Sequence, residues 1–351
     1  MKAIVKQAPG PGNLAVVEWP DPVARPGQVV VDIAVGGICS TDVAIYAGTY
    51  KGRHELRCPT MVGHEAAGIV TAAAEDVDDL AVGDRVALQV IWGHPHAWQS
   101  LIGHENLDPD WIHIGASALG GTFAERIAVP ADRVLRLPGG VDWESAALLE
   151  PLAVAAHAME LVRIAPGESL VIVGPGQFGL LMLLIARAAG AGPIAVVGLA
   201  GVDDARLARA GELGADALIA CAGDLAAVDA AIRAVVGPDG ADVVQDCGGT
   251  AESTTIALDA AAPAGRVGIF GFTPRVEIEP LRQIIRKGLT LHGVSAAQRR
   301  HYAIALRMIE RGAVDPRRIV SHRLPVWEAE EGLRLVQSRA ATKVLLETPA
   351  G

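Results

Sequence analysis

The chain has 351 residues, of which 51% are hydrophobic; this is enough for two domains with a large buried core and excludes a disordered protein. Its 40 acidic and 30 basic residues give a net charge of −10 at pH 7, which argues against a nucleic-acid partner. Four widely spaced cysteines without a CxxC pair, and a polar stretch where a signal peptide would be apolar, predict a cytoplasmic protein.

Up to about residue 150, the pattern is that of a compact, mostly β domain. Short runs rich in β-branched residues alternate with Gly, Pro and Asp turns, as in strands joined by tight connections. The predicted strands cover residues 29–35, 67–70 and 84–88.

Beyond Glu150, apolar strands alternate with Ala- and Leu-rich helical segments, which predicts a parallel sheet with crossover helices. These strands cover residues 169–173, 194–197, 243–245 and 267–270. A helix at 302–311 and a strand at 343–346 are expected to rejoin the first domain. The sequence therefore predicts an α/β protein with domain segments at 1–152, 153–290 and 291–351.

The longest apolar stretch, residues 170–191, has nearly the length of a membrane span. Gly174, Pro175, Gly176 and Gly179 interrupt it near its start, and Arg187 lies within it. It is therefore interpreted as a buried strand, a tight turn and a helix, and no membrane partner is expected.

The same stretch carries a GxGxxG motif directly after a strand and at the start of a helix. Gly174 allows the tight turn, Gly176 lets the backbone approach a pyrophosphate, and Gly179 lets helix and strand pack closely. With Gln177 and Phe178 between them, these residues open a helix whose N-terminus attracts phosphate. A dinucleotide such as NAD or NADP is the predicted ligand.

The form of the dinucleotide is left open by the second strand of this domain. An acidic residue at its end would bind the adenosine ribose of NAD, but Gly198 stands there. Arg206 is suited to the extra phosphate of NADP, whereas the neighbouring Asp203 and Asp204 oppose it.

A second set of residues has metal-ligand chemistry. Cys39, His64 and the carboxylates of Glu65 and Glu150 provide one thiolate, one imidazole and oxygen ligands. Such a set suits zinc in a catalytic site that keeps one coordination position free. Each residue alone has an ordinary structural explanation, and the combination with the dinucleotide motif is what favours a metal site.

Together these motifs resemble the zinc-dependent medium-chain dehydrogenase/reductase family. The likeness covers nearly the whole chain. It rests on the segment Gly-Ile-Cys-Ser-Thr-Asp at 37–42, on Gly63-His64-Glu65, on the Glu-Pro-Leu-Ala run at 150–153 of the sorbitol and polyol branch, on the glycine motif, and on the closing Lys-Val-Leu-Leu at 343–346.

The resemblance implies a GroES-like β-barrel catalytic domain built from both chain ends, with a Rossmann domain inserted between them. It implies a zinc-dependent oxidoreductase that transfers a hydride between a secondary alcohol or polyol-like substrate, or its ketone, and NAD or NADP. The cofactors would be NAD(P) and one catalytic zinc per chain.

Individual roles also follow from the resemblance. Cys39 and His64 would bind zinc, with Glu150 or Glu65 as the remaining carboxylate, and the choice between the two glutamates stays open. Asp42 would orient His64, an arrangement that fixes the ring tautomer, and Thr41 would hand on the substrate proton. Besides the glycine motif, Gly198, Arg206, Gly271 and Ser295 are assigned to the cofactor site.

The chain departs from the family in the lobe that holds a second, structural zinc in many relatives. Their four cysteine positions align with Trp92, Pro95, Trp98 and Asp108, so this zinc is expected to be absent. A replacement metal site is a weaker alternative to a surface lobe held by packed tryptophans and polar contacts. The histidines that such a site would use are His94, His96, His104 and His113.

Two further departures concern the reaction. Ala44 takes the place of a histidine that passes the proton to solvent in relatives. The segment Ser295-Ala296-Ala297 stands where the polyol branch tends to place an arginine that binds substrate hydroxyls. Two alternatives therefore remain: a zinc-independent enone or quinone reductase of the same fold, and a catalytically silent dinucleotide-binding protein. A homodimer or homotetramer is expected, with an exposed edge strand near residues 267–270 as the pairing surface.

Overall fold

The computed structural model describes residues 1–116, 119–272 and 275–349. The chain forms two compact units. Unit 1 comprises Met1–Ala153, Ala297–Gly312 and Val320–Gly351, and unit 2 comprises Val154–Ala296 and Ala313–Ile319. Both chain ends therefore belong to unit 1.

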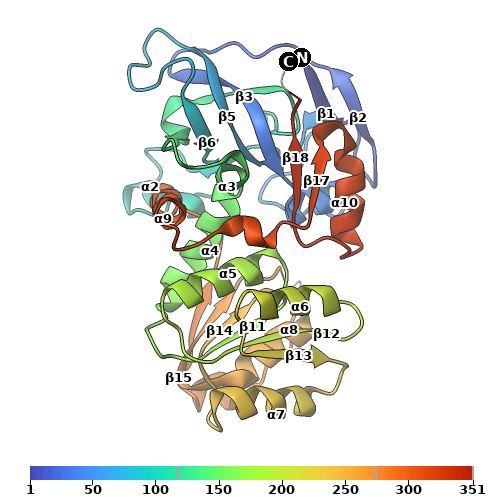
Figure 1. The fold of residues 1–351 in the computed structure, drawn as a ribbon, viewed down its shortest axis with the longest axis vertical. Coiled ribbons are helices and arrows are strands. Elements are labelled where there is room, and N and C mark those ends of the chain that lie inside the picture. The colour runs from blue at the N-terminus through green and yellow to red at the C-terminus, as the bar shows by residue number, and fades with distance from the viewer. Residues whose placement is uncertain (117–118, 273–274, 350–351) are drawn as a thin grey trace. The chain divides into compact units, whose positions relative to one another are not determined.

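Unit 1 is built around a mostly antiparallel sheet with the strand order β10-β6-β5-β3-β18-β17, and β9 also pairs with β3 (Figure 1). A second sheet has the order β2-β1-β4, and β7 pairs with β8. The strands are β1 (Lys2–Lys6), β2 (Leu14–Glu18), β3 (Gln28–Gly37), β4 (Thr60–Met61), β5 (Glu65–Ala73), β6 (Arg85–Leu88), β7 (Ile91–Trp92), β8 (Ile112–His113), β9 (Arg126–Pro130), β10 (Val134–Arg136), β17 (His322–Pro325) and β18 (Val344–Glu347).

The last strand completes this sheet. β18 pairs antiparallel with β3, placing Leu345 opposite Gly37, so this last strand belongs to the main sheet of unit 1. Its apolar side chains are needed there, because Val344 and Leu346 belong to a buried cluster with Ile38 and Phe123. The helices of unit 1 are α1 (Ser40–Tyr46), α2 (Trp98–Leu101), α3 (Trp143–Ala147), α9 (Arg299–Glu310) and α10 (Ala329–Gln337), with the 3-10 turns η1 (Glu105–Leu107), η2 (Ala131–Arg133) and η5 (Val326–Glu328).

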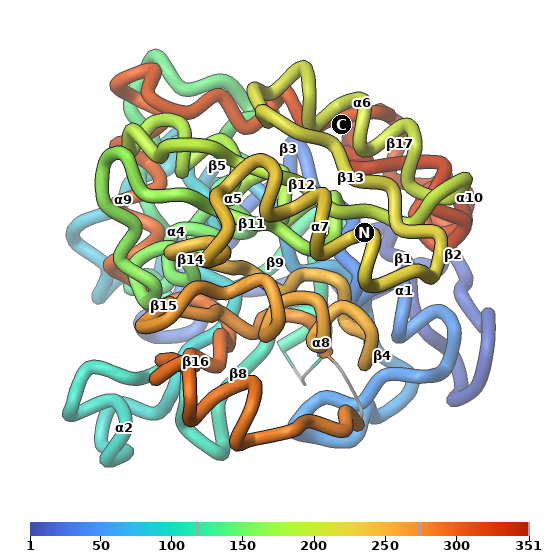
Figure 2. Tube along the Cα trace, turned by 90° about the horizontal axis from the view of Figure 1, so that it is seen from below, coloured from blue at the N-terminus to red at the C-terminus, as the bar shows by residue number. Residues whose placement is uncertain are grey.

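Unit 2 is a doubly wound parallel sheet with the strand order β13-β12-β11-β14-β15-β16, and its chain path can be followed in Figures 1 and 2. This is the 3-2-1-4-5-6 order of the dinucleotide-binding fold. The strands are β11 (Leu170–Val173), β12 (Ile194–Leu199), β13 (Ala217–Cys221), β14 (Ala241–Asp246), β15 (Ala261–Ile269) and β16 (Thr290–Gly293). The helices are α5 (Gln177–Ala188), α6 (Asp204–Glu212), α7 (Leu225–Val236), α8 (Ala251–Ala260), the π-helix η3 (Leu281–Ile285) and the 3-10 turn η4 (Pro316–Ile319), while α4 (Leu149–Val162) begins in unit 1.

The edge of this sheet differs from the prediction. Residues 267–270 were expected to form an exposed edge, but β15 lies between β14 and β16. The edge strand next to β15 is β16, whose short run Thr-Leu-His-Gly at 290–293 has little apolar periodicity. Sequence pattern therefore identified the more buried neighbour instead.

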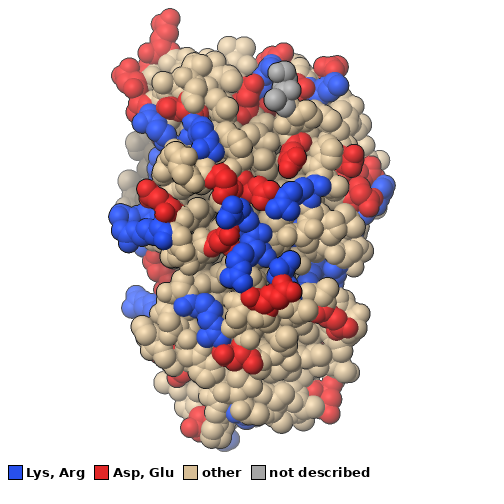
Figure 3. All heavy atoms as spheres, in the orientation of Figure 1, with Lys and Arg blue, Asp and Glu red and all other residues tan. Residues whose placement is uncertain are grey.

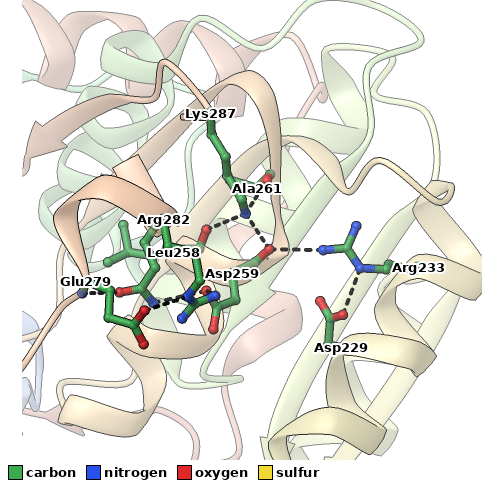
Figure 4. A network of polar contacts seen from close by, with 9 residues as sticks. Asp229, Arg233, Leu258, Asp259, Ala261, Glu279, Arg282 and Lys287 are labelled. Carbon is green, nitrogen blue, oxygen red and sulfur yellow. Dashed lines mark hydrogen bonds and ion pairs between the residues drawn. The ribbon is translucent and has the colours of Figure 1, made fainter. Parts of the chain in front are cut away.

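A polar network closes the end of α8 (Figure 4). Lys287 donates hydrogen bonds to the backbone carbonyls of Leu258, Asp259 and Ala261, where the helix leaves its last carbonyls without helical partners. Arg282 pairs with the Asp259 carboxylate at 2.9 Å. Lys287 and Arg282 therefore stabilise the fold of unit 2, because they bind oxygen atoms of the chain itself.

The helices and the surface charge bear on the predictions about membrane and nucleic-acid partners. Among the described residues, no helix is long and apolar enough to cross a membrane, and residues 170–191 form β11, a turn and α5. On the face that Figure 3 shows, Lys and Arg side chains lie with Asp and Glu side chains beside them.

Candidate active site

The start of α1 positions the first candidate metal ligand. Cys39 is the residue before the helix, and its backbone N–H donates to Asp42 Oδ2 at 2.9 Å. The other oxygen of the same carboxylate lies 3.1 Å from His64 Nδ1. When the ring proton is on Nδ1, this contact leaves His64 Nε2 as the free electron-pair donor for a metal. Thr41 is the second residue of α1 and is half-buried.

A buried ion pair lies directly beside these residues. Lys343, from the segment before β18, donates to the carbonyl of Ile38 at 2.9 Å and pairs with Glu65 Oε2. Both side chains are fully buried. Gly37 is required here, because a Cβ at this position would lie 2.1 Å from Glu65 Oε2. The sequence offered Lys343 only as part of a closing motif, without a role.

The arrangement fits a zinc ion. Cys39, His64 and Glu65 each offer a ligand atom, and the three atoms lie within 4.8 Å of one another; within the described ranges they are the one such group of three. Glu150 is not part of this group but is a buried neighbour, in the first turn of α4. Glu65 Oε1 and Glu150 Oε2 have no hydrogen-bond partner among the described residues. Buried carboxylate oxygens without partners are costly unless a cation binds them.

Electrostatics in the site reflect its burial. Burial, followed by the negative charge of Glu65, raises the pKa of Glu150 to about 8. Burial lowers the pKa of His64, but Asp42 and Cys39 act more strongly together and hold it well above its usual value. Since zinc binds neutral imidazole, thiolate and carboxylate, metal uptake by these residues releases protons.

Asp42 provides the first test of this geometry. Asp42→Asn removes the charge that holds the Nδ1 proton of His64, so zinc affinity is expected to fall by about 10- to 100-fold. The measurement is competition for zinc against a chromogenic chelator. Asp32→Asn is the control, because Asp32 is a half-exposed partner of Arg126 in the same unit. Equal zinc affinities of wild type and Asp42→Asn would contradict the positioning role.

The lobe expected to lack a structural zinc is held by hydrogen bonds. The Glu105 carboxylate accepts from Gln89 Nε2 at 3.1 Å, Arg133 Nη1 at 3.0 Å and the backbone N–H of Arg299 at 3.0 Å. Gln298 Nε2 lies 3.2 Å from both His104 Nδ1 and Asn106 Oδ1. Asp108, which aligns with a cysteine position of relatives, accepts hydrogen bonds from the backbone N–H groups of His94 and Asp110.

The prediction that packed tryptophans hold this lobe is correct for Trp92 and wrong for Trp98. Trp92 is buried, with the Arg133 guanidinium 5.6 Å from its ring centroid, whereas Trp98 is 68% exposed. The four histidines of the lobe form no metal-binding group among the residues that the structure describes.

Glu105 should therefore matter for stability. Glu105→Ala leaves three donors without their acceptor and is expected to lower the free energy of unfolding by about 2–3 kcal/mol. Glu144→Ala is the matched control: Glu144 pairs with the half-exposed Arg323, and such surface pairs contribute less than about 1 kcal/mol. Urea unfolding of both variants measures the difference. Equal losses would show that Glu105 is only a surface residue.

His113 is the one lobe histidine close to the metal-site residues. It lies in β8, is 8% exposed, and its ring centroid is 5.1 Å from that of His64 in an edge-to-face arrangement. Burial, followed by the charge of His64, lowers the pKa of His113 to about 3. From the sequence, His113 is assigned to a surface lobe. Its contact with His64 depends on the tertiary fold and has no counterpart in the neighbouring sequence.

The glycine motif forms the predicted turn. Gly174 follows β11 with φ +105°, and Gly176 directly precedes α5. A Cβ on Gly179 would lie 2.2 Å from the Gly174 carbonyl oxygen, whereas a Cβ on Gly176 would meet no atom within 4 Å. Gln177 begins the helix, and the Phe178 ring centroid lies 4.4 Å from that of Phe270. The open space at Gly176 leaves room for the backbone to be approached by a ligand, which the predicted pyrophosphate site requires.

The other predicted cofactor residues lie at the same edge of the sheet. Gly198 is the penultimate residue of β12, Gly271 follows β15, and Ser295 follows β16. They share one edge of the sheet, because the carboxyl ends of parallel strands lie on the same side. At Gly271 the backbone is close to that of Gly249, since a Cβ there would be 2.2 Å from the Gly249 nitrogen.

Asp203 brings a buried carboxylate close to the end of β12. It is 4% exposed, its Oδ2 accepts from the backbone N–H of Leu199 at 3.0 Å, and its Oδ1 lies 3.5 Å from Arg206 Nη1. A Cβ on Gly198 would be 3.0 Å from the Asp203 Cβ. Arg206 and Asp203 therefore neutralise each other beside Gly198.

Comparison with known proteins adds independent findings. A model of the alcohol dehydrogenase GroES-like domain matches residues 25–139, and a zinc-binding dehydrogenase model matches residues 178–311. A sorbitol dehydrogenase of Halalkalibacterium halodurans is 31% identical over 350 residues, covering 99% of each chain. The structure of 2R,3R-butanediol dehydrogenase from Bacillus subtilis is 27% identical, with a TM-score of 0.88 and 99% coverage of each chain. A candidate zinc-binding dehydrogenase from Sinorhizobium meliloti 1021, bound to NADP, is 30% identical with a TM-score of 0.88, covering 99% of this chain and 98% of its own.

Proposed function

The chain belongs to the zinc-dependent medium-chain dehydrogenase/reductase family, and we propose that it oxidises secondary alcohols or polyols at a single zinc held by Cys39, His64 and a glutamate. It is an NAD(P)-dependent oxidoreductase that acts on a small-molecule substrate. The proposed GroES-like catalytic domain corresponds to unit 1, and the proposed Rossmann domain corresponds to unit 2. The observation that carries the proposal is the convergence of Cys39, His64 and Glu65 within 4.8 Å.

The chain's residues have distinct tasks in this reaction. When bound, zinc lowers the pKa of the substrate hydroxyl and NAD(P) accepts the hydride. Asp42 holds the tautomer of His64, and Lys343 balances the charge of Glu65. Either Glu65 or Glu150 completes the ligand set through its unpartnered oxygen. Thr41 receives the substrate proton and passes it to water, since Ala44 offers no imidazole.

The cofactor site favours neither nucleotide strongly. Gly198 provides no carboxylate to bind the ribose of NAD or to repel the extra phosphate of NADP, and Arg206 is paired with Asp203. We therefore expect the dissociation constants of NADH and NADPH to agree within about tenfold, or about 1.4 kcal/mol. Fluorescence titration of both nucleotides measures this ratio, and a larger difference would contradict the proposed neutral site.

The oligomer is proposed to be a homodimer or homotetramer that pairs through unit 2. The edge strand β16 has unpaired backbone groups along one side among the described residues. Exposed apolar side chains accompany this part of unit 2: Phe272, Ile278, Leu281, Ile285 and Leu291. Light scattering at several concentrations tests this, and a monomer throughout would exclude it.

Turnover assays test the function itself. Zinc-loaded protein is incubated with NAD or NADP and a panel of secondary alcohols and polyols, including sorbitol, and nucleotide reduction is followed at 340 nm. Zinc-dependent reduction by at least one of them is the expected result. Reduction of an enone by chelator-treated protein, without alcohol oxidation, would instead support the zinc-independent reductase.

A further inference from the structure

A buried ring nitrogen beside the active site has no assigned purpose. No described residue gives His113 Nε2 a hydrogen-bond partner, although the atom is buried. Neutral imidazole offers one donor and one acceptor, and a buried polar atom without a partner is costly. Such an atom in a native structure indicates a ligand or water that completes it.

The position of His113 is fixed from two sides. In the β7–β8 pair, His113 lies opposite Ile91. Its ring lies 6.2 Å, between centroids, from that of Trp111, whose other neighbour is the Arg53 guanidinium at 4.5 Å. Arg53 is itself held by hydrogen bonds to the carbonyls of Leu107 and Asp108 at 3.1 and 2.8 Å. The imidazole is thus pre-organised, which a binding residue requires.

The neighbour of His113 determines what it meets. Its ring touches that of His64, the histidine proposed to bind zinc, with centroids 5.1 Å apart. A substrate whose reacting hydroxyl is held at Cys39, His64 and a glutamate must place its remaining atoms around His64, and the His113 ring forms part of that surrounding. An oxygen on the carbon next to the reacting one is a group that a second imidazole can bind.

We infer that His113 Nε2 binds a substrate oxygen adjacent to the reacting hydroxyl, so that the enzyme prefers vicinal diols over simple secondary alcohols. This inference rests on the proposed alcohol dehydrogenase function. His113 is then a specificity-determining residue, because a site built to hydrogen-bond an oxygen discriminates against substrates that lack it.

The test compares 2,3-butanediol with 2-butanol in the wild type, in His113→Phe and in the control His96→Phe. His96 is an exposed histidine of the same lobe. His113→Phe is expected to raise KM and lower kcat/KM for the diol by about 10- to 100-fold while changing 2-butanol oxidation less than about threefold. His96→Phe is expected to change neither. Calorimetry of diol binding to the complex with reduced nucleotide, which does not turn over, should show the same loss of affinity.

Three results would overturn the inference. Equal losses for both alcohols would indicate a general structural role, and loss of zinc from His113→Phe would make His113 part of the metal site. An unchanged diol KM with unchanged diol affinity would show that Nε2 does not meet the substrate. Failure of the proposed function is distinguishable, because zinc-loaded wild type would then oxidise no alcohol and the inference would fall with it.

Discussion

Replacing His64 with alanine is expected to remove the bound zinc and to lower kcat/KM by at least about 10³-fold. A catalytic metal stabilises the developing negative charge by several kcal/mol, and each factor of ten in rate corresponds to about 1.36 kcal/mol. His64 is also the ligand that Asp42 orients, at 3.1 Å from Nδ1 to Oδ1, so the mutation removes both a ligand atom and the group that holds it in place.

The control for this variant is His96→Ala, which removes an exposed imidazole outside the site. Zinc content and steady-state kinetics are measured on both proteins, together with thermal midpoints to confirm folding. A His64→Ala protein that keeps both its zinc and most of its activity would refute the assignment of the metal site.

Changes in the glycine motif should separate folding from nucleotide binding. In Gly179→Ala, the new Cβ meets the Gly174 carbonyl oxygen at 2.2 Å and Ile172 Cγ2 at 3.0 Å, so α5 must move away from β11. Such overpacking is expected to destabilise unit 2 by about 1–3 kcal/mol or more and to abolish nucleotide binding at assay concentrations. Gly176→Ala meets no atom within 4 Å, so its stability should match that of the wild type.

Nucleotide affinity is where Gly176→Ala should differ from the wild type. Its Cβ enters the space proposed for the pyrophosphate, and NADH and NADPH affinities are expected to fall at least about tenfold, or about 1.4 kcal/mol. Urea unfolding and nucleotide titration of both variants provide the two readouts. If Gly176→Ala bound nucleotide normally, the phosphate would not pass this residue.

Local signals in the sequence predicted much of the fold. The GroES-like and Rossmann architecture is confirmed. It could be predicted because strands such as residues 170–173 and turn glycines such as Gly174 are recognisable from short segments of sequence. The ligand candidates Cys39, His64 and Glu65 were also found locally, since each lies in a compact motif. Their convergence within one site is a property of the structure.

Contacts between distant residues could not be predicted in the same way. Lys343 and Glu65 are 278 positions apart, and only the antiparallel pairing of β18 with β3 reveals why a buried lysine is tolerated. The Asp203 carboxylate contacts the Leu199 backbone at the end of β12, because a turn brings it back across four positions of the sequence. The role of His113 depends on packing between the lobe and His64, and periodicity carries no information about such packing.

The central claim is a single zinc at Cys39, His64 and a glutamate, and metal analysis of the purified protein tests it most directly. Wild type should contain about one zinc per chain, as expected for a catalytic site without a structural one, and Cys39→Ser should contain almost none. Two zinc ions per chain would reveal a second site in the lobe, and a wild type that oxidises alcohols without zinc would contradict the account.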